Sequence, residues 1–178
     1  MQLKNARVIV TGASSGIGRA IAVEFGRRGA RLALASRDQS ALEEAAAAIK
    51  IDGGSAVVIP TDVTVEGAVK EMADAAIREL GGIDILVNNA GIGLTAPIAD
   101  ASSADVDKLF GLNVIAAAAA IRAVIPIMRT QGSGMIINIS SMAGRVVIPR
   151  IGYARRASSP WLRSVMPCGW RSPIAAAT

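Results

Sequence analysis

The sequence contains no histidine, and Cys168 is its only cysteine. These two residue types are the usual ligands of zinc and other transition metals, so we expect no metal site. The lack of histidine also excludes catalysis by a histidine base, and one cysteine cannot build a disulfide framework. With no disulfide to form, a cytoplasmic location is the default prediction.

Long apolar runs are scarce as well. We find none that reaches the length of a membrane span, and the first five residues lack the core of a signal peptide, so we expect no membrane partner. Hydrophobic residues nevertheless make up 52% of the 178 residues, against 19% for charged residues. This balance favours one domain with a substantial core and excludes a disordered chain.

The net charge of +5 is concentrated in one part of the chain. Residues 1–153 carry 15 basic and 14 acidic side chains, whereas residues 154–178 carry four arginines and no acid. Because the basic excess belongs to a tail and not to a folded face, we expect no nucleic-acid partner.

Apolar strand-like runs alternate with helical patterns along residues 1–153. We predict strands at residues 7–10, 31–35, 55–59, 83–87 and 134–139, and helices at residues 19–28, 41–51, 65–80 and 104–130. Asp38 and Thr64 are the expected N-caps of the second and third helices, and Pro126 is expected to kink the fourth. This alternation predicts an α/β fold: a Rossmann-like, doubly wound parallel sheet with strand order 3-2-1-4-5.

A glycine-rich turn, Thr11–Gly18, joins the first strand to the first helix. Its glycines let the backbone turn tightly and approach a pyrophosphate, which the free N–H groups of the following helix attract. The alternative is an ordinary strand–helix turn. The turn resembles the T-G-x-x-x-G-x-G pattern of the short-chain dehydrogenase/reductase family. The resemblance assigns cofactor binding to Gly12, Ser14, Ser15, Gly16, Ile17 and Gly18.

Ser36 and Arg37 follow the second strand, at the position that selects the cofactor. An acidic residue there would bind the ribose 2′-hydroxyl, whereas a guanidinium beside a small hydroxyl suits a 2′-phosphate. The resemblance therefore implies NADP, with NAD as the other possibility. Arg37 could equally be a solvated surface charge.

Two further clusters follow predicted strands. Asp62 and Val63 match the pair that contacts adenine in the family, although Asp62 could simply cap a turn. Asn88 is followed by Asn89, Ala90 and Gly91, and the resemblance implies that this N-N-A-G segment holds the central strand and lines the adenine and ribose site. An asparagine-rich turn is the alternative.

The resemblance also assigns catalytic residues. Asn113, inside the fourth helix, matches an asparagine that holds a water molecule in a proton relay; a packing or surface role is the alternative. Ser141 matches the serine that hydrogen-bonds the substrate oxygen, and Ser140 remains possible when the alignment starts from the tyrosine. Tyr153 matches the general acid or base.

The pattern breaks after Tyr153. The family has a lysine four residues later, on the same helix face, and this chain has Ala157. Residues 154–178 then lose apolar periodicity, and we expect an irregular, basic tail. Back-translation in a shifted frame allows Ser-Ala-Ser-Lys-Leu-Ala-Leu-Ala from Ala154 onward, so we interpret the break as a reading-frame shift. A genuinely divergent tail is the alternative.

These observations lead to two hypotheses of function. The first is an NAD(P)-dependent oxidoreductase, acting on a small-molecule carbonyl or alcohol, whose present chain is C-terminally truncated and impaired. The second is a non-catalytic, nucleotide-binding or regulatory module. In both, residues 1–153 form a dinucleotide-binding domain, and the resemblance implies a homo-oligomer for the full-length family form.

Overall fold

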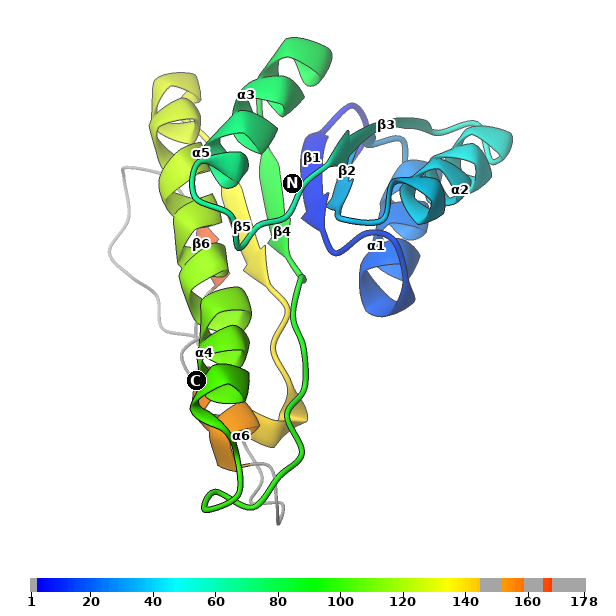
Figure 1. The fold of residues 1–178 in the computed structure, drawn as a ribbon. Helices are drawn as coiled ribbons and strands as arrows, with labels where there is room; N and C mark the ends of the chain where they lie inside the picture. Colours follow the sequence, from blue (N-terminus) through cyan, green and yellow to red (C-terminus); the bar gives the residue numbers. More distant parts are fainter. Residues whose placement is uncertain (1–2, 145–151, 159–164, 168–178) are drawn as a thin grey trace.

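Figure 1 shows the fold in a computed structural model, which describes residues 3–144, 152–158 and 165–167. The strands are β1 (Arg7–Thr11), β2 (Arg31–Ser36), β3 (Ser55–Pro60), β4 (Ile85–Asn88), β5 (Met135–Asn138) and β6 (Val165–Pro167). The helices are α1 (Gly16–Arg27), α2 (Gln39–Ile51), α3 (Ala68–Leu80), α4 (Ser103–Phe110), the π-helical η1 (Gly111–Ala116), α5 (Ala117–Gln131), the 3-10 helix η2 (Met142–Gly144) and α6 (Gly152–Ser158).

The sheet has the order β3-β2-β1-β4-β5-β6, and β1 to β5 are parallel. This confirms the predicted Rossmann-like fold and its strand order 3-2-1-4-5. The order reverses between β1 and β4, so the carboxyl ends of these two strands border the crevice where such sheets bind ligands.

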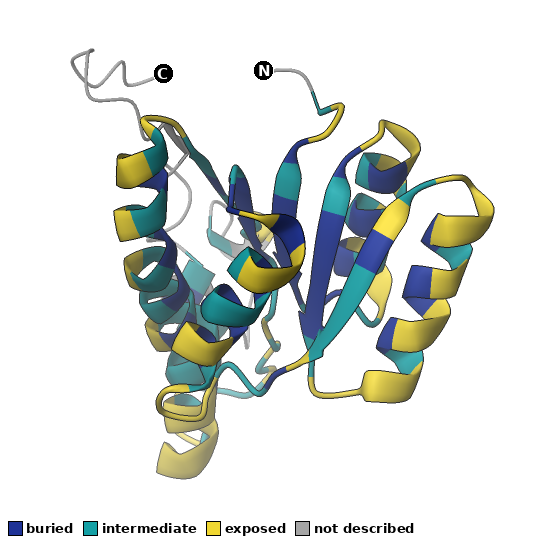
Figure 2. Ribbon diagram, turned by 90° about the horizontal axis from the view of Figure 1, so that it is seen from above, coloured by how far each residue is buried: buried dark blue, intermediate teal, exposed yellow. Residues whose placement is uncertain are grey.

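Two apolar cores lie on opposite faces of the sheet. Val8 and Val10 pack with α1 and α2 on one face, and Ile9 packs with α3 and α5 on the other. Successive strand residues point to opposite faces, so a continuous apolar run feeds both cores. Figure 2 shows the result: the central strands are buried, and exposure rises on the outer sides of the helices.

Strand β6 differs from the expected irregular tail. It pairs antiparallel with β5, joining Ile137 to Val165 and Met135 to Pro167 in register. The edge of β5 presents unpaired N–H and C=O groups, and a strand added from the tail satisfies part of them. Helix α6 also extends into the tail, up to Ser158. The expectation for residues 159–164 and 168–178 lies outside the described residues.

The helix starts show one correct and one wrong prediction. Asp38 is the N-cap of α2, and its carboxylate accepts a hydrogen bond from the N–H of Ala41 at 3.0 Å. Thr64 does not cap α3, which begins after Gly67, a residue in the left-handed conformation. The hydroxyl of Thr64 donates to Asp62 instead, in the turn before the helix.

The predicted helix at residues 104–130 is continuous from Ser103 to Gln131, with a π-helical segment in the middle. The most apolar 18 residues of this 29-residue helix have a mean hydropathy of 1.9, and 17% of them are buried, so by length and composition the helix could cross a membrane. The expectation that no segment reaches this length is therefore wrong by that measure. One such helix is weak evidence for a membrane, because core helices of water-soluble proteins pass the same test.

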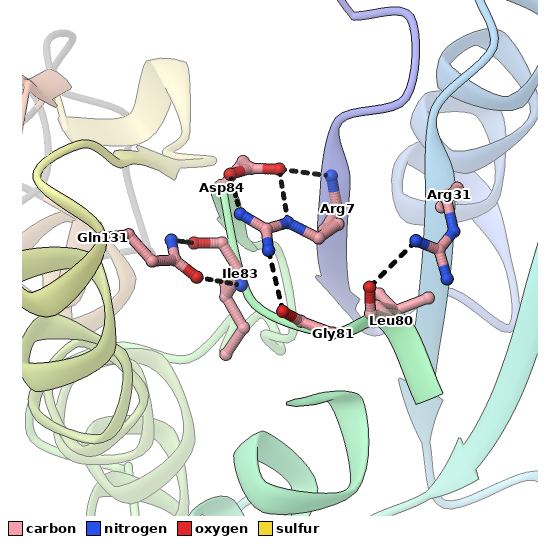
Figure 3. A network of polar contacts seen from close by, with 7 residues as sticks. All are labelled: Arg7, Arg31, Leu80, Gly81, Ile83, Asp84 and Gln131. Carbon is pink, nitrogen blue, oxygen red and sulfur yellow. Dashed lines mark hydrogen bonds and ion pairs between the residues drawn. The ribbon is translucent and has the colours of Figure 1, made fainter. Parts of the chain in front are cut away.

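A polar network braces the amino ends of β1 and β4 (Figure 3). The guanidinium of Arg7 donates to both oxygens of Asp84, at 2.8 and 2.6 Å, and to the carbonyl of Gly81 at 2.8 Å. The side-chain amide of Gln131 exchanges two hydrogen bonds with the backbone of Ile83, at 2.7 and 3.0 Å. The hydrogen bond from Arg7 is the main reason that the pKa of Asp84 lies below its usual value. The network fixes the end of the sheet opposite to the glycine turn.

Candidate active site

The glycine turn leaves no room for side chains at two of its three glycines. Gly12 has a φ of +65°, and a Cβ there would lie 2.9 Å from Nδ2 of Asn89. A Cβ on Gly18 would collide with the carbonyl oxygen of Gly12 and with Nδ2 of Asn89. Gly16 has a φ of +53° and nothing within 4 Å of its Cβ position. The backbone of the turn is therefore closely packed at Gly12 and Gly18, whereas Gly16, at the start of α1, faces open space.

Helix α1 begins beside this turn without a side-chain cap. Its N-cap residue, Ser15, is extended and makes no capping hydrogen bond, and the first turn contains no acidic residue. The side chain of Ile17 is 63% exposed. Uncapped N–H groups and the positive end of the helix dipole together favour an anionic ligand such as a pyrophosphate.

Thr11 ties the end of β4 to the glycine turn. Its hydroxyl accepts hydrogen bonds from the N–H groups of Asn89 (3.0 Å) and Ala90 (3.2 Å). The side-chain amide of Asn89 donates to the carbonyls of Thr11 (3.1 Å) and Gly12 (3.2 Å). Asn89 thus holds the turn by its backbone and by its side chain, and the cofactor contacts expected of the N-N-A-G segment stay predictions.

Asn88 braces the other side of β4. It is 6% exposed, and its amide donates to Oδ1 of Asn138 at 2.9 Å and to the carbonyl of Ala117 at 3.4 Å. The sequence interpretation gave no role to Asn138 or to the hydroxyl of Thr11. The available signal was a polar residue inside an apolar strand, because buried polar groups need partners.

Arg37 and Asp62 meet where β2 and β3 end. The N–H of Thr61 donates to the carbonyl of Ser36 at 2.8 Å. The residues that follow these two form an ion pair, with Nη1 of Arg37 3.9 Å from Oδ2 of Asp62. Thr64 donates to Oδ1 of Asp62 from its N–H (2.9 Å) and its hydroxyl (2.6 Å). These bonds, with a smaller contribution from Arg37, lower the pKa of Asp62. Asp62 does cap a turn, and it also faces Arg37.

A small hollow of about 10 Å³ lies between the crevice and the π-helical segment. It is lined by residues from four stretches of the chain: Thr11, Val63, Asn88, Ala90, Leu112, Ala116, Ala117 and Ala120. Its volume suits about one water molecule. The hollow brings Val63 and Ala90, two of the predicted cofactor contacts, to the same place.

Asn113 lies in the π-helical segment η1, and its side chain is paired with the loop after β4. Oδ1 accepts from the N–H of Ile92 at 2.9 Å, and Nδ2 donates to the carbonyl of Ile92 at 2.8 Å. A Cβ on Gly91 would lie 3.2 Å from Oδ1 of Asn113. Single π-helical turns inside α-helices are frequent at functional sites. The loop after the N-N-A-G segment is therefore held directly by Asn113.

The two candidate serines differ in their surroundings. The hydroxyl of Ser140 donates to the carbonyl of Ser158 at 2.8 Å, which ties the end of β5 to the end of α6. Ser141 is exposed. Tyr153 is half-buried on α6, which packs against α4 and η1, so the helix with the tyrosine adjoins the segment with Asn113. Ala157, four residues further on, is completely buried.

A family model described as short chain dehydrogenase matches residues 6–154. The chain belongs to the short-chain dehydrogenase family. The match ends one residue after Tyr153, which confirms the resemblance expected over residues 1–153 and leaves most of the tail outside it.

The chain is similar to several known short-chain dehydrogenases. Ketoacyl reductase HetN of Nostoc sp. is 38% identical over 138 residues, which are 78% of this chain and 48% of that protein. The structure of an NAD⁺-bound xylitol dehydrogenase is 35% identical with a TM-score of 0.85, and the match covers 89% of this chain and 62% of that one. A metagenomic short-chain oxidoreductase in complex with NADP is 34% identical with a TM-score of 0.84, and the match covers 89% and 72%.

The chain spans 48% to 64% of the length of the first curated relatives that it matches. In this short-chain dehydrogenase the structure brings Gly12, Gly18 and Asn89 into direct contact, and it joins Arg37 to Asp62. For the predicted catalytic residues it shows that their elements adjoin, and the catalytic roles stay predictions.

Proposed function

We propose that the chain is the cofactor-binding part of an NAD(P)-dependent oxidoreductase that moves hydride between a nicotinamide cofactor and a small-molecule carbonyl or alcohol. The observation that carries the proposal is the glycine turn. A Cβ would fill the space at Gly12 and Gly18, and the uncapped first turn of α1 begins beside them. A bare backbone beside free N–H groups fits a pyrophosphate.

The proposed cofactor is NADP, with NAD as a weaker ligand. The guanidinium of Arg37 is 71% exposed at the end of β2, and Ser36 leaves the neighbouring position without an acid. Of the two similar structures named above, one holds NAD⁺ and the other NADP, so family membership does not decide the preference. A guanidinium binds a phosphate by charge-assisted hydrogen bonds, which NAD cannot form at this position.

The proposed chemistry divides between two hydroxyl groups. The cofactor, when bound, supplies or accepts the hydride. The hydroxyl of Tyr153 would give a proton to the substrate oxygen in reduction, and its ionised form would take a proton from that oxygen in oxidation. The hydroxyl of Ser141 would hydrogen-bond that oxygen as charge develops.

We further propose that this chain binds the cofactor but turns substrate over poorly. The family lysine would stand at Ala157, and a completely buried methyl group there offers neither charge nor a hydrogen bond. Cofactor binding depends on the glycine turn, Asn89 and Arg37, which are all present. We therefore expect the chain to bind the cofactor while its turnover of substrate is impaired.

The test is a pair of fluorescence titrations, with NADPH and with NADH. The chain should bind both and bind NADPH more tightly, and Ser36→Asp should reverse the order because a carboxylate repels the 2′-phosphate and binds the 2′-hydroxyl. Arg28→Ala, which removes an exposed arginine paired with Glu24 at the far end of α1, is the matched control and should change neither affinity. Failure to bind either nucleotide would refute the proposal, and equal affinities would refute the assignment of Arg37.

A further inference from the structure

We propose that Asp62 is a cofactor-specificity residue, which limits the preference for NADP by competing with the 2′-phosphate for the guanidinium of Arg37. The inference rests on the proposed function, in which Arg37 receives that phosphate. In this inference Asp62 weakens the preference for NADP that Arg37 creates.

The backbone fixes Arg37 and Asp62 as neighbours. The N–H of Thr61, just after β3, donates to the carbonyl of Ser36, the last residue of β2, at 2.8 Å. Arg37 and Asp62 each directly follow one of these two bonded residues. Their side chains then lie 3.9 Å apart, from Nη1 of Arg37 to Oδ2 of Asp62.

Asp62 is the fixed member of this pair. Both donors of Thr64 hold its Oδ1, at 2.9 and 2.6 Å, which leaves Oδ2 directed at Arg37. Its side chain is 33% exposed, against 71% for Arg37. Because the carboxylate is already ordered by Thr64, only the arginine loses freedom when the ion pair forms. Oδ2 of Asp62 therefore lies within ion-pair distance of the guanidinium of Arg37.

A 2′-phosphate must compete with this arrangement. Its charge lies between −1 and −2 at neutral pH, so a carboxylate within reach of the same guanidinium both repels it and holds part of the arginine's hydrogen-bonding capacity. NAD carries no charge at this position, so its binding is insensitive to the competition.

The size of the effect follows from the exposure of the pair. Exposed ion pairs contribute little to stability, and charges at this spacing are strongly weakened by water. We expect removal of the Asp62 charge to raise the affinity for NADPH relative to NADH about three- to tenfold. The ratio of the two affinities is the right quantity, because the two nucleotides share every other group and changes at the adenine cancel.

The experiment measures the dissociation constants of NADPH and NADH for the chain, Asp62→Asn, Arg37→Ala and the double variant. In Asp62→Asn the side-chain oxygen still accepts from Thr64, and its charge is gone. Asp62→Ser, a smaller acceptor, is the second variant if the first does not fold. Asp74→Asn removes a carboxylate from another exposed ion pair, with Lys70 at 2.7 Å, and should leave the ratio unchanged.

The expected result in Asp62→Asn is a rise in the affinity for NADPH relative to the affinity for NADH. The rise should be clearly smaller when Arg37 is already alanine. An unchanged ratio in both Asp62 variants, with a fall in Arg37→Ala, would overturn this inference and leave the proposed function standing. An unchanged ratio in Arg37→Ala would overturn the NADP assignment, and with it the competition. Absence of binding by either nucleotide would overturn both proposals.

Discussion

The side chain of Asn113 and the backbone of Ile92 exchange two hydrogen bonds, from Nδ2 to the carbonyl at 2.8 Å and from the N–H to Oδ1 at 2.9 Å. The pairing explains why an asparagine interrupts an apolar helix. Among the residues that the structure describes, no strand pairs with the loop after β4 at this point, and the amide supplies the donor and the acceptor that another peptide would supply. Asn113 thus joins the nucleotide side of the site to the helix that adjoins α6.

The first prediction follows from this pair. Asn113→Ala leaves the half-buried N–H and carbonyl of Ile92 without partners and should lower the free energy of unfolding by about 1–3 kcal/mol. Urea denaturation of the chain and the variant measures it. Gln39→Ala removes an exposed amide that donates to Glu43 at 2.8 Å, and this control should have almost no effect.

The isosteric variant Asn113→Asp tests the same pair through the pH dependence of stability. The introduced carboxyl can accept from the N–H of Ile92 in either form, but only its protonated form can donate to the carbonyl. Its pKa should therefore be higher in the folded state than in the unfolded state. The added bond is fully present below pH of about 4 and is lost as the pH rises. The stability gap between the variant and the parent should widen from pH 4 to pH 7, and a constant gap would contradict the pairing.

The fold was predictable from the sequence because its signals are local. Apolar strands alternating with helices determine a parallel sheet, and Asp38 is a cap whose donor lies three residues away. Thr64 failed as a cap because Asp62, two residues earlier, takes its hydroxyl, and Gly67 supplies the left-handed turn that starts α3. Asp62 and Thr64 are both good capping residues, so the sequence alone does not determine which of them forms the turn before α3.

The contacts of the candidate site were less predictable, because they join distant segments. The motifs indicate the residue types, but the bonds from Asn89 to Thr11 and from Asn88 to Asn138 span 78 and 50 residues. The π-helical turn around Asn113 and the pairing of β6 with β5 also depend on tertiary partners. Neither leaves a periodic pattern in the sequence.

The second prediction separates two glycines of the turn. Gly18→Ala drives a methyl group into the backbone of Gly12 and should destabilise the fold by about 1–3 kcal/mol while abolishing nucleotide binding. Gly16→Ala meets open space and should cost only the strain of its positive φ, about 1–2 kcal/mol, while weakening the nucleotide. Gly93→Ala, which also meets nothing within 4 Å, should be neutral in thermal melts and titrations. A stable, nucleotide-binding Gly18→Ala variant would contradict the close packing.

The third prediction concerns acid stability and the pair of Arg7 and Asp84. The folded-state pKa of Asp84 is lowered, chiefly by the hydrogen bond from Arg7, so the pair stabilises the fold above the unfolded pKa of about 3.9. This stability is lost as the pH falls through the lower, folded-state value. Asp84→Asn should therefore lower stability by about 1–3 kcal/mol at pH 7, with a deficit that shrinks below pH of about 4. Urea midpoints at several pH values test this, and a deficit independent of pH would refute it.

The last prediction is catalytic. Tyr153 and Ala157 lie one helical turn apart on α6, and the second position, where the family keeps its lysine, is a completely buried methyl group. Acid–base assistance is worth roughly a hundred- to ten-thousandfold, so its loss should leave no measurable NADPH oxidation with carbonyl substrates.

Ala157→Lys alone should not restore turnover, because burying an ammonium without a partner is costly and would disturb the packing of α6. A chain continued in the shifted frame after Tyr153 should be active, and Tyr153→Phe should abolish that activity. The decisive measurement is the initial rate of NADPH oxidation by the 178-residue chain and by its Tyr153→Phe variant. A robust rate that disappears in the variant would show that Tyr153 works without the lysine, and the predicted separation of binding from turnover would then be wrong.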